Sequence, residues 1–93
     1  MDITLYMWED YESDEFSGKI ITLLLLVPLE FKIQSFDKDT EMDVVSKTIG
    51  EKVRKLPQIV VDGEKIGGYY DLVEFLLNKD IINYAGEPQW KNN

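Results

Sequence analysis

The 93-residue chain contains no cysteine and no histidine. Without cysteine it has no thiol nucleophile, no disulfide, and no thiolate ligand for zinc or an iron–sulfur cluster. Without histidine it lacks the side chain that most often serves as a general base near neutral pH. These two absences exclude most of the common catalytic constellations.

Basic residues are also scarce, because 10 lysines and arginines face 18 acids and leave a formal charge of −8. Such a charge repels the phosphate backbone of nucleic acids and anionic membranes, so we expect neither as a direct partner. A protein partner with a basic surface fits better. Residues 1–46 carry the whole excess, and five acids fall between Glu9 and Glu15. This run forms either a solvated acidic loop or a contact surface.

Long apolar runs are missing as well. The longest, residues 20–27, is far shorter than the ~20 residues that a bilayer span needs, so we interpret it as a buried element. No targeting leader precedes the first strand pattern, and we expect a cytoplasmic protein that is monomeric by default. The length suits one domain with one modest core.

The first half of the chain alternates between strand and helix patterns. Residues 3–7 have the period-two pattern of a strand, and Ser13 is a suitable N-cap for a helix that runs to about Leu26. Pro28 ends that helix. Residues 29–36 again have period two and predict a second strand. The helix would bury Phe16, Ile20, Leu24 and Val27, and the second strand would bury Leu29, Phe31 and Ile33.

The second half predicts a short helix, a hairpin and a final helix. Thr40 would cap a helix that ends at Ile49, with Asp43 as an imperfect capping-box partner and Gly50 closing it. Asp62-Gly63 is a hairpin signal between strands at residues 58–61 and 64–66. Residues 69–79 form the last helix, and the polar tail of residues 80–93 has Trp90 as its large apolar anchor. The order β-α-β-α-β-β-α predicts an α/β protein with helices flanking one sheet.

The segment KLPQIVVDGEKIGGYYDLVEFL, residues 55–76, resembles the C-terminal half of glutaredoxins. There an apolar residue and a cis-proline begin the third strand, a DG hairpin follows, and GG-aromatic-x-DL opens the next helix. ITLYMWED, residues 3–10, is similar to the first glutaredoxin strand. The resemblance implies a thioredoxin/glutaredoxin fold with a four-stranded mixed sheet over residues 1–79, and a cis bond before Pro57. Small glutaredoxins are frequent in bacteriophages and other viruses, so it also suggests a viral regulator of a host protein.

The resemblance places Tyr11-Glu12-Ser13-Asp14 where glutaredoxins carry Cys-Pro-Tyr-Cys or a Cys-x-x-Ser variant. The nucleophile position corresponds to Tyr11, whose phenol cannot exchange disulfides. Disulfide reduction, deglutathionylation and cluster ligation all need the missing sulfur. We therefore expect a redox-inactive, non-enzymatic protein without catalytic residues.

Our leading hypothesis is a protein-binding or regulatory module that uses the acidic, aromatic face where the active site would lie. Its predicted contact residues are Trp8, Glu9, Asp10, Tyr11, Glu12, Ser13, Asp14, Pro57 and Tyr70. We expect the aromatic residues of this face, together with Tyr69, to converge there as interface anchors. The alternative is that Trp8 and Tyr69 are packing residues. Pro57 likewise either shapes a strand start or exposes backbone to an extended peptide.

Two other functions stay open. A glutathione or small-anion site, as the resemblance implies, would use Leu56, Pro57, Gly68, Tyr69, Tyr70 and Asp71, although Tyr70 and the nearby acids disfavour an anionic tripeptide. Acidic mimicry of nucleic acid is the other, and the balanced charge of the second half disfavours it. We expect no obligatory cofactor and no metal. The calcium-loop-like residues 37–43 fail because Met42 and Thr48 stand where glycine and glutamate are required.

Overall fold

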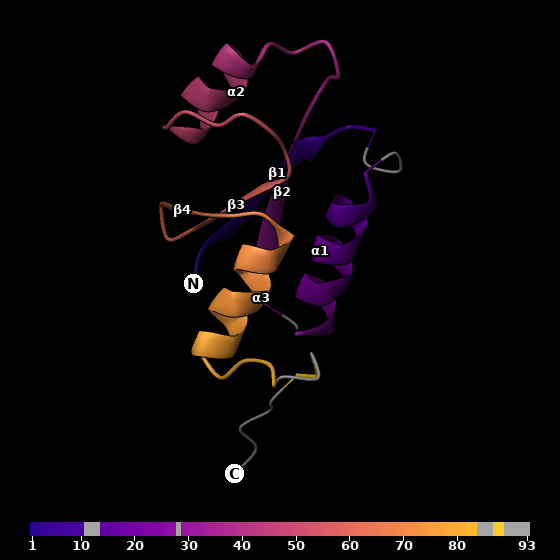
Figure 1. Cartoon of the computed structure of the whole chain (residues 1–93), viewed down its shortest axis with the longest axis vertical. Coiled ribbons are helices and arrows are strands. Elements are labelled where there is room, and N and C mark those ends of the chain that lie inside the picture. The colour runs from indigo at the N-terminus through magenta and orange to yellow at the C-terminus, as the bar shows by residue number, and fades with distance from the viewer. Residues whose placement is uncertain (11–13, 28, 84–86, 89–93) are drawn as a thin grey trace.

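Strand β1 (Ile3–Trp8) lies at the centre of the sheet in the computed structural model, which describes residues 1–10, 14–27, 29–83 and 87–88. The strand order is β2-β1-β3-β4, with β1 parallel to β2 and antiparallel to β3. The mixed four-stranded sheet with flanking helices confirms the predicted fold class (Figure 1). The remaining elements are α1 (Glu15–Leu26), β2 (Phe31–Phe36), α2 (Met42–Ile49), β3 (Gln58–Val61), β4 (Glu64–Gly67) and α3 (Tyr69–Asn78).

The main core lies between the sheet and the helix pair α1 and α3, which lie side by side (Figure 1). Alternate residues of β1 point into it, because successive strand side chains face opposite sides. The buried members of this core are Ile3, Leu5, Met7, Ile20, Leu23, Leu24, Val27, Ile59, Val61, Leu72, Leu76 and Ile82. The predicted stripe on the first helix is therefore correct at Ile20, Leu24 and Val27, while Phe16 is half-buried.

A second, smaller core joins α2 to the carboxyl ends of β1 and β2. Phe36, Val45, Val53 and Leu56 are buried in it, and Tyr6 and Trp8 pack against them. The Ser46 hydroxyl accepts a hydrogen bond from the Val53 amide (2.9 Å) and donates one to the Val53 carbonyl (3.2 Å). These two bonds hold the chain after α2 against the helix and direct it toward Pro57.

The helix starts differ from prediction at two positions. Asp14, not Ser13, is the N-cap of α1, and Ser13 lies outside the described residues together with Pro28. Glu41, not Thr40, precedes α2, without a side-chain cap and without the predicted role for Asp43. The reason at α2 is a turn, since the Thr40 amide donates to the Asp37 carbonyl at 2.9 Å and so holds Thr40 outside the helix.

Strand β2 is shorter and more exposed than predicted. It begins at Phe31 rather than Leu29, and Ile33 is 47% exposed. β2 is exposed because it lies at the edge of the sheet and has only one neighbouring strand. A period-two pattern predicts which face a side chain takes, and an edge strand buries that face only in part.

The hairpin and the glycine stop are as predicted. Asp62 (φ 51°) and Gly63 (φ 82°) both adopt the left-handed conformation that a two-residue type I′ turn requires. Gly50, at φ 102°, closes α2. The Leu56–Pro57 bond is cis, as the resemblance implied.

The segment after α3 joins the main core. Ile82 is 3% exposed and belongs to the main core, and the Ile81 amide donates to the Leu76 carbonyl at 2.9 Å. The prediction that Trp90 is the apolar anchor of a polar tail therefore missed Ile82; Trp90 itself lies outside the described residues. The domain boundary at residue 79 stays a prediction. Among the described residues, no helix has the length and apolar character that a bilayer crossing requires.

Candidate functional site

A groove of about 230 Å³ lies where the starts of α1 and α3 meet the loop at Pro57. We call it the α1–α3 groove. Its lining residues are Asp14, Phe16, Lys55, Leu56, Pro57, Gly68, Tyr69, Tyr70 and Asp71. The sheet explains this meeting point: Tyr6 pairs with Gln58, so the Pro57 loop lies at the end of β1 from which the chain continues toward α1.

Asp14 forms one end of the groove and begins α1. Its Oδ1 accepts a hydrogen bond from the Phe16 amide (2.9 Å), and its Oδ2 accepts one from the Ser17 hydroxyl (2.7 Å). Ser17 is fully buried, so this carboxylate is the partner of a hydroxyl that water does not reach. The Asp14 side chain therefore occupies the amide end of α1 that would otherwise attract an anion.

Asp71 does the same for α3. Its Oδ2 accepts a hydrogen bond from the Gly68 amide at 3.0 Å. The preceding Gly67 has φ 117°, and a side chain there would collide with the Asp71 carboxylate. The diglycine thus lets the chain turn from β4 into α3 while the carboxylate folds back onto the helix start.

Three aromatic rings line the groove together with these carboxylates. The centroids of Tyr69 and Tyr70 lie 5.2 Å apart, and Phe16 lies 5.7 Å from Tyr70 and 6.1 Å from Tyr69. Tyr70 is roughly perpendicular to both other rings and is 70% exposed. We call Phe16, Tyr69 and Tyr70 the aromatic triad.

The Pro57 loop also lines the groove. The Leu56 side chain is buried in the second core. Among the described residues, no hydrogen bond joins the Leu56 backbone amide or carbonyl. Backbone groups that the fold leaves without a partner are available to a bound chain.

The structure brings seven of the predicted site residues together in this groove. They are Asp14, Leu56, Pro57, Gly68, Tyr69, Tyr70 and Asp71. Trp8 packs in the second core instead of with the triad, as the packing alternative had it. Glu9 and Asp10 are exposed, and the Glu9 amide donates to the Phe36 carbonyl at 2.8 Å. Tyr11, Glu12 and Ser13 lie outside the described residues.

Sequence reasoning missed Phe16 and Lys55 as groove residues. Phe16 was assigned to the buried stripe of the first helix, since its four-residue spacing to Ile20 fits that stripe. Its contacts with Tyr69 and Tyr70 join residues more than fifty positions apart, and helical spacing carries no information about such contacts. Lys55 had one available signal, its position directly before the resemblance's apolar residue and proline.

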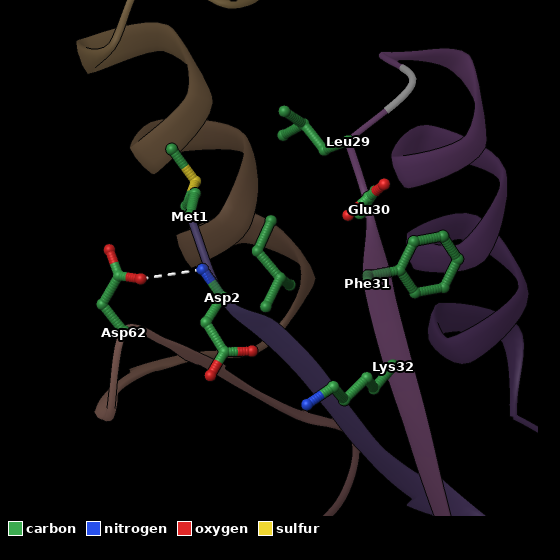
Figure 2. Close-up of a pocket in the computed structure, with 8 residues that line it drawn as sticks. Met1, Asp2, Leu29, Glu30, Phe31, Lys32 and Asp62 are labelled. Atoms are coloured by element: carbon green, nitrogen blue, oxygen red, sulfur yellow. Dashed lines mark hydrogen bonds between the residues drawn. The ribbon is translucent and has the colours of Figure 1, made fainter.

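Two wider, open hollows lie away from the predicted residues. One, of about 720 Å³, lies at the amino ends of β1 and β2 (Figure 2). There the Asp2 amide donates a hydrogen bond to Asp62 Oδ1 at 2.7 Å. The other, about 780 Å³, lies between α2 and residues 50–54. The α1–α3 groove is smaller, but it combines aromatic faces, carboxylates and a backbone segment with free polar groups. We therefore treat it as the candidate site.

The comparison with known proteins rests on structure, because no protein-family model and no curated protein matches the sequence. Glutaredoxin 1 from Francisella tularensis, crystallised with cacodylate, aligns with a TM-score of 0.67 at 15% identity, over 85% of this chain and 94% of that one. The E. coli glutaredoxin aligns with a TM-score of 0.54 at 21% identity, over 85% and 96%. The chain has a glutaredoxin fold.

The chain has this fold with no cysteine among its 93 residues. In the described part of the chain, no three acidic side chains lie close enough together to hold a metal ion. The groove can instead supply aromatic contact, carboxylate charge and main-chain hydrogen bonds, which are the means of a binding site.

Proposed function

We propose that this protein is a redox-inactive, glutaredoxin-like binding module that holds an extended segment of a protein partner in the α1–α3 groove. The observation that carries the proposal is the groove itself. An exposed aromatic ring lines the same cavity as Leu56, whose backbone groups have no hydrogen-bond partner among the described residues, and the chain has no thiol.

The size of the groove favours a peptide segment over a small-molecule ligand. Pockets for small molecules usually enclose about 300–1,000 Å³, and this groove has about 230 Å³. One or two side chains of an extended segment fit such a volume. The Leu56 backbone would pair with the main chain of the segment, and Tyr70 would act as the aromatic anchor.

Glutathione or a small anion is the competing ligand, and whether it can bind depends on the amides at the two helix starts. Helix N-termini bind anions through free amides. In this groove the Asp14 and Asp71 carboxylates already accept hydrogen bonds at both helix starts. An incoming carboxylate would have to displace or approach two negative charges, so we rank this function second.

Selection from a displayed random-peptide library on the full chain tests the proposal. The dissociation constant of a selected peptide is then measured for the wild-type chain, for Tyr70→Ala and for Val44→Ala. Val44 is a matched control, because it is also an exposed apolar residue but lies on α2. We expect Tyr70→Ala to weaken binding at least about five-fold, as for a typical anchor residue, and Val44→Ala to leave it unchanged.

Amide chemical shifts separate the competing functions. Shifts at Leu56 and residues 68–71 on adding the peptide support the proposal. Saturation of the same amides by glutathione at sub-millimolar concentration, with no peptide selected, would replace it with the anion-binding function. Capture of a nucleic-acid-binding protein that competing DNA releases would instead favour acidic mimicry.

A further inference from the structure

Tyr70 is the most exposed ring of the aromatic triad, at 70%. It meets Phe16 (66°) and Tyr69 (68°) in edge-to-face geometry, so the three rings do not form a flat stack. Because the face of an aromatic ring is electronegative, an exposed ring of this kind attracts cations.

The ammonium group of Lys19 already makes cation–π contacts with two of these rings. The Lys19 ammonium lies 5.6 Å from the Phe16 centroid and 5.8 Å from that of Tyr69, within the ~6 Å range of cation–π attraction. Its pairing with Glu15 is long, at 3.8 Å. Among the described residues no cation lies over Tyr70.

The charges around the triad favour a cation as well. Asp14 and Asp71 both line the groove and accept hydrogen bonds at helix starts. The positive end of a helix dipole equals only about half an elementary charge, so each carboxylate keeps a net negative charge there. Lys55 is the one basic residue among the described lining residues. The net charge of −8 adds a long-range attraction for cations.

We propose that the α1–α3 groove recognises an arginine or lysine side chain of the partner segment, with the cation against Tyr70 and in the field of the Asp14 and Asp71 carboxylates. This inference rests on the proposed function, because it names the side-chain class that the groove selects. The Lys19 ammonium lies over the other two rings, and its positive charge opposes the incoming cation.

Two capped tripeptides test the inference by amide and side-chain chemical shifts of the full-length chain at low salt. One is acetyl-Ala-Arg-Ala-amide, and the other replaces arginine with citrulline, which has nearly the same shape but no charge. We expect the arginine peptide to shift Phe16 and residues 69–71 and to bind at least about three-fold more tightly than the citrulline peptide. Added salt should reduce that difference.

Four variants separate the contributions of single side chains to binding of the arginine peptide. Tyr70→Leu should weaken the arginine peptide about two- to five-fold, the range of an exposed cation–π contact, and leave the citrulline peptide unchanged. Asp71→Asn keeps the acceptor for the Gly68 amide but removes the charge, and should also weaken arginine. Glu74→Gln makes the same charge change on α3 outside the groove lining and should have little effect. Lys19→Gln should tighten arginine binding.

Equal binding of both tripeptides, or no groove shift with either up to the solubility limit, would overturn the cation inference. So would an equal loss of arginine binding in Asp71→Asn and Glu74→Gln. None of these results touches the proposed function, which fails separately when no library peptide binds at the groove.

Discussion

At the scale of single residues, Asp14 connects the stability of the fold to the groove. Its carboxylate caps α1 through the Phe16 amide and satisfies the buried Ser17 hydroxyl. The capped Phe16 is also the first ring of the aromatic triad. The position of Phe16 in the groove therefore depends on a helix cap, and the contribution of that cap to the free energy of unfolding can be measured.

We expect Asp14→Ala to lower the free energy of unfolding by about 1–2 kcal/mol, because one helix amide and one buried hydroxyl lose their partner. Asp14→Asn keeps an acceptor oxygen and should cost less than half as much. Urea denaturation followed by circular dichroism measures both. An alanine variant as stable as the wild-type chain would show that the cap contributes nothing.

The same residues show where sequence prediction stops. Ser13 and Asp14 are both preferred N-cap residues, and their identities do not decide between them. Ser17 favours Asp14 as the N-cap, because its hydroxyl, three residues further on, donates a hydrogen bond to the Asp14 carboxylate. Phe16, Tyr69 and Tyr70 each appear in the sequence as local helix residues. Their meeting needs the whole sheet between them, which local patterns do not describe.

At the scale of elements, α1 shows how helical geometry divides an apolar run. Four consecutive leucines end the helix, yet Leu23 and Leu24 are buried while Leu25 and Leu26 are exposed. Because a helix turns about 100° per residue, four neighbours cannot all face one core. The predicted spacing of the buried stripe correctly separated Leu24 from Leu25.

This division gives a matched pair of substitutions in one helix. Leu24→Ala should lower the free energy of unfolding by about 2–5 kcal/mol, since it removes a fully buried side chain and leaves a cavity. Leu25→Ala, at a position that is 65% exposed, should change it by less than about 0.5 kcal/mol. Thermal and urea unfolding of the two variants check this. Similar losses in both would mean that Leu25 is covered in solution.

Elements with strong local signals were predicted closely, and those that depend on their surroundings were not. The hairpin, the glycine stop at Gly50 and α3 follow from turn chemistry and helical spacing. The exposure of Ile33 depends on β2 lying at the sheet edge, and the start of α2 depends on a turn at Asp37. Edge position and competing turns are tertiary or medium-range properties, so residue patterns predict them poorly.

At the scale of the whole molecule, the chain has a glutaredoxin fold although it contains no cysteine. The segment of residues 55–76 predicted the fold because its turns, cis-proline and diglycine shape the backbone. The groove follows from that backbone, since the helix starts and the Pro57 loop meet at one end of β1. The ligand does not follow from the backbone, because side chains such as Tyr70 and Asp71 set the chemistry of the groove lining.

The extent of the folded unit is also a property of the whole molecule, and Ile82 tests it. This side chain is 3% exposed and closes the main core from beyond the predicted boundary at residue 79. We expect Ile82→Ala to lower the free energy of unfolding by about 2–4 kcal/mol. Truncation after Lys79 should cost at least as much, because it also removes the Ile81 amide that donates to the Leu76 carbonyl.

Asn78→Ala is the matched control, because it truncates an exposed side chain at the end of α3 and should change the free energy of unfolding by less than about 0.5 kcal/mol. Urea unfolding of the three variants gives the comparison. A truncated chain as stable as the full one would place the boundary at residue 79 and make Ile82 dispensable. A truncated chain that loses stability as Ile82→Ala does would extend the folded unit to include Ile82. The stability of the fold would then depend on a main-core residue that lies outside the glutaredoxin-like segment of residues 55–76.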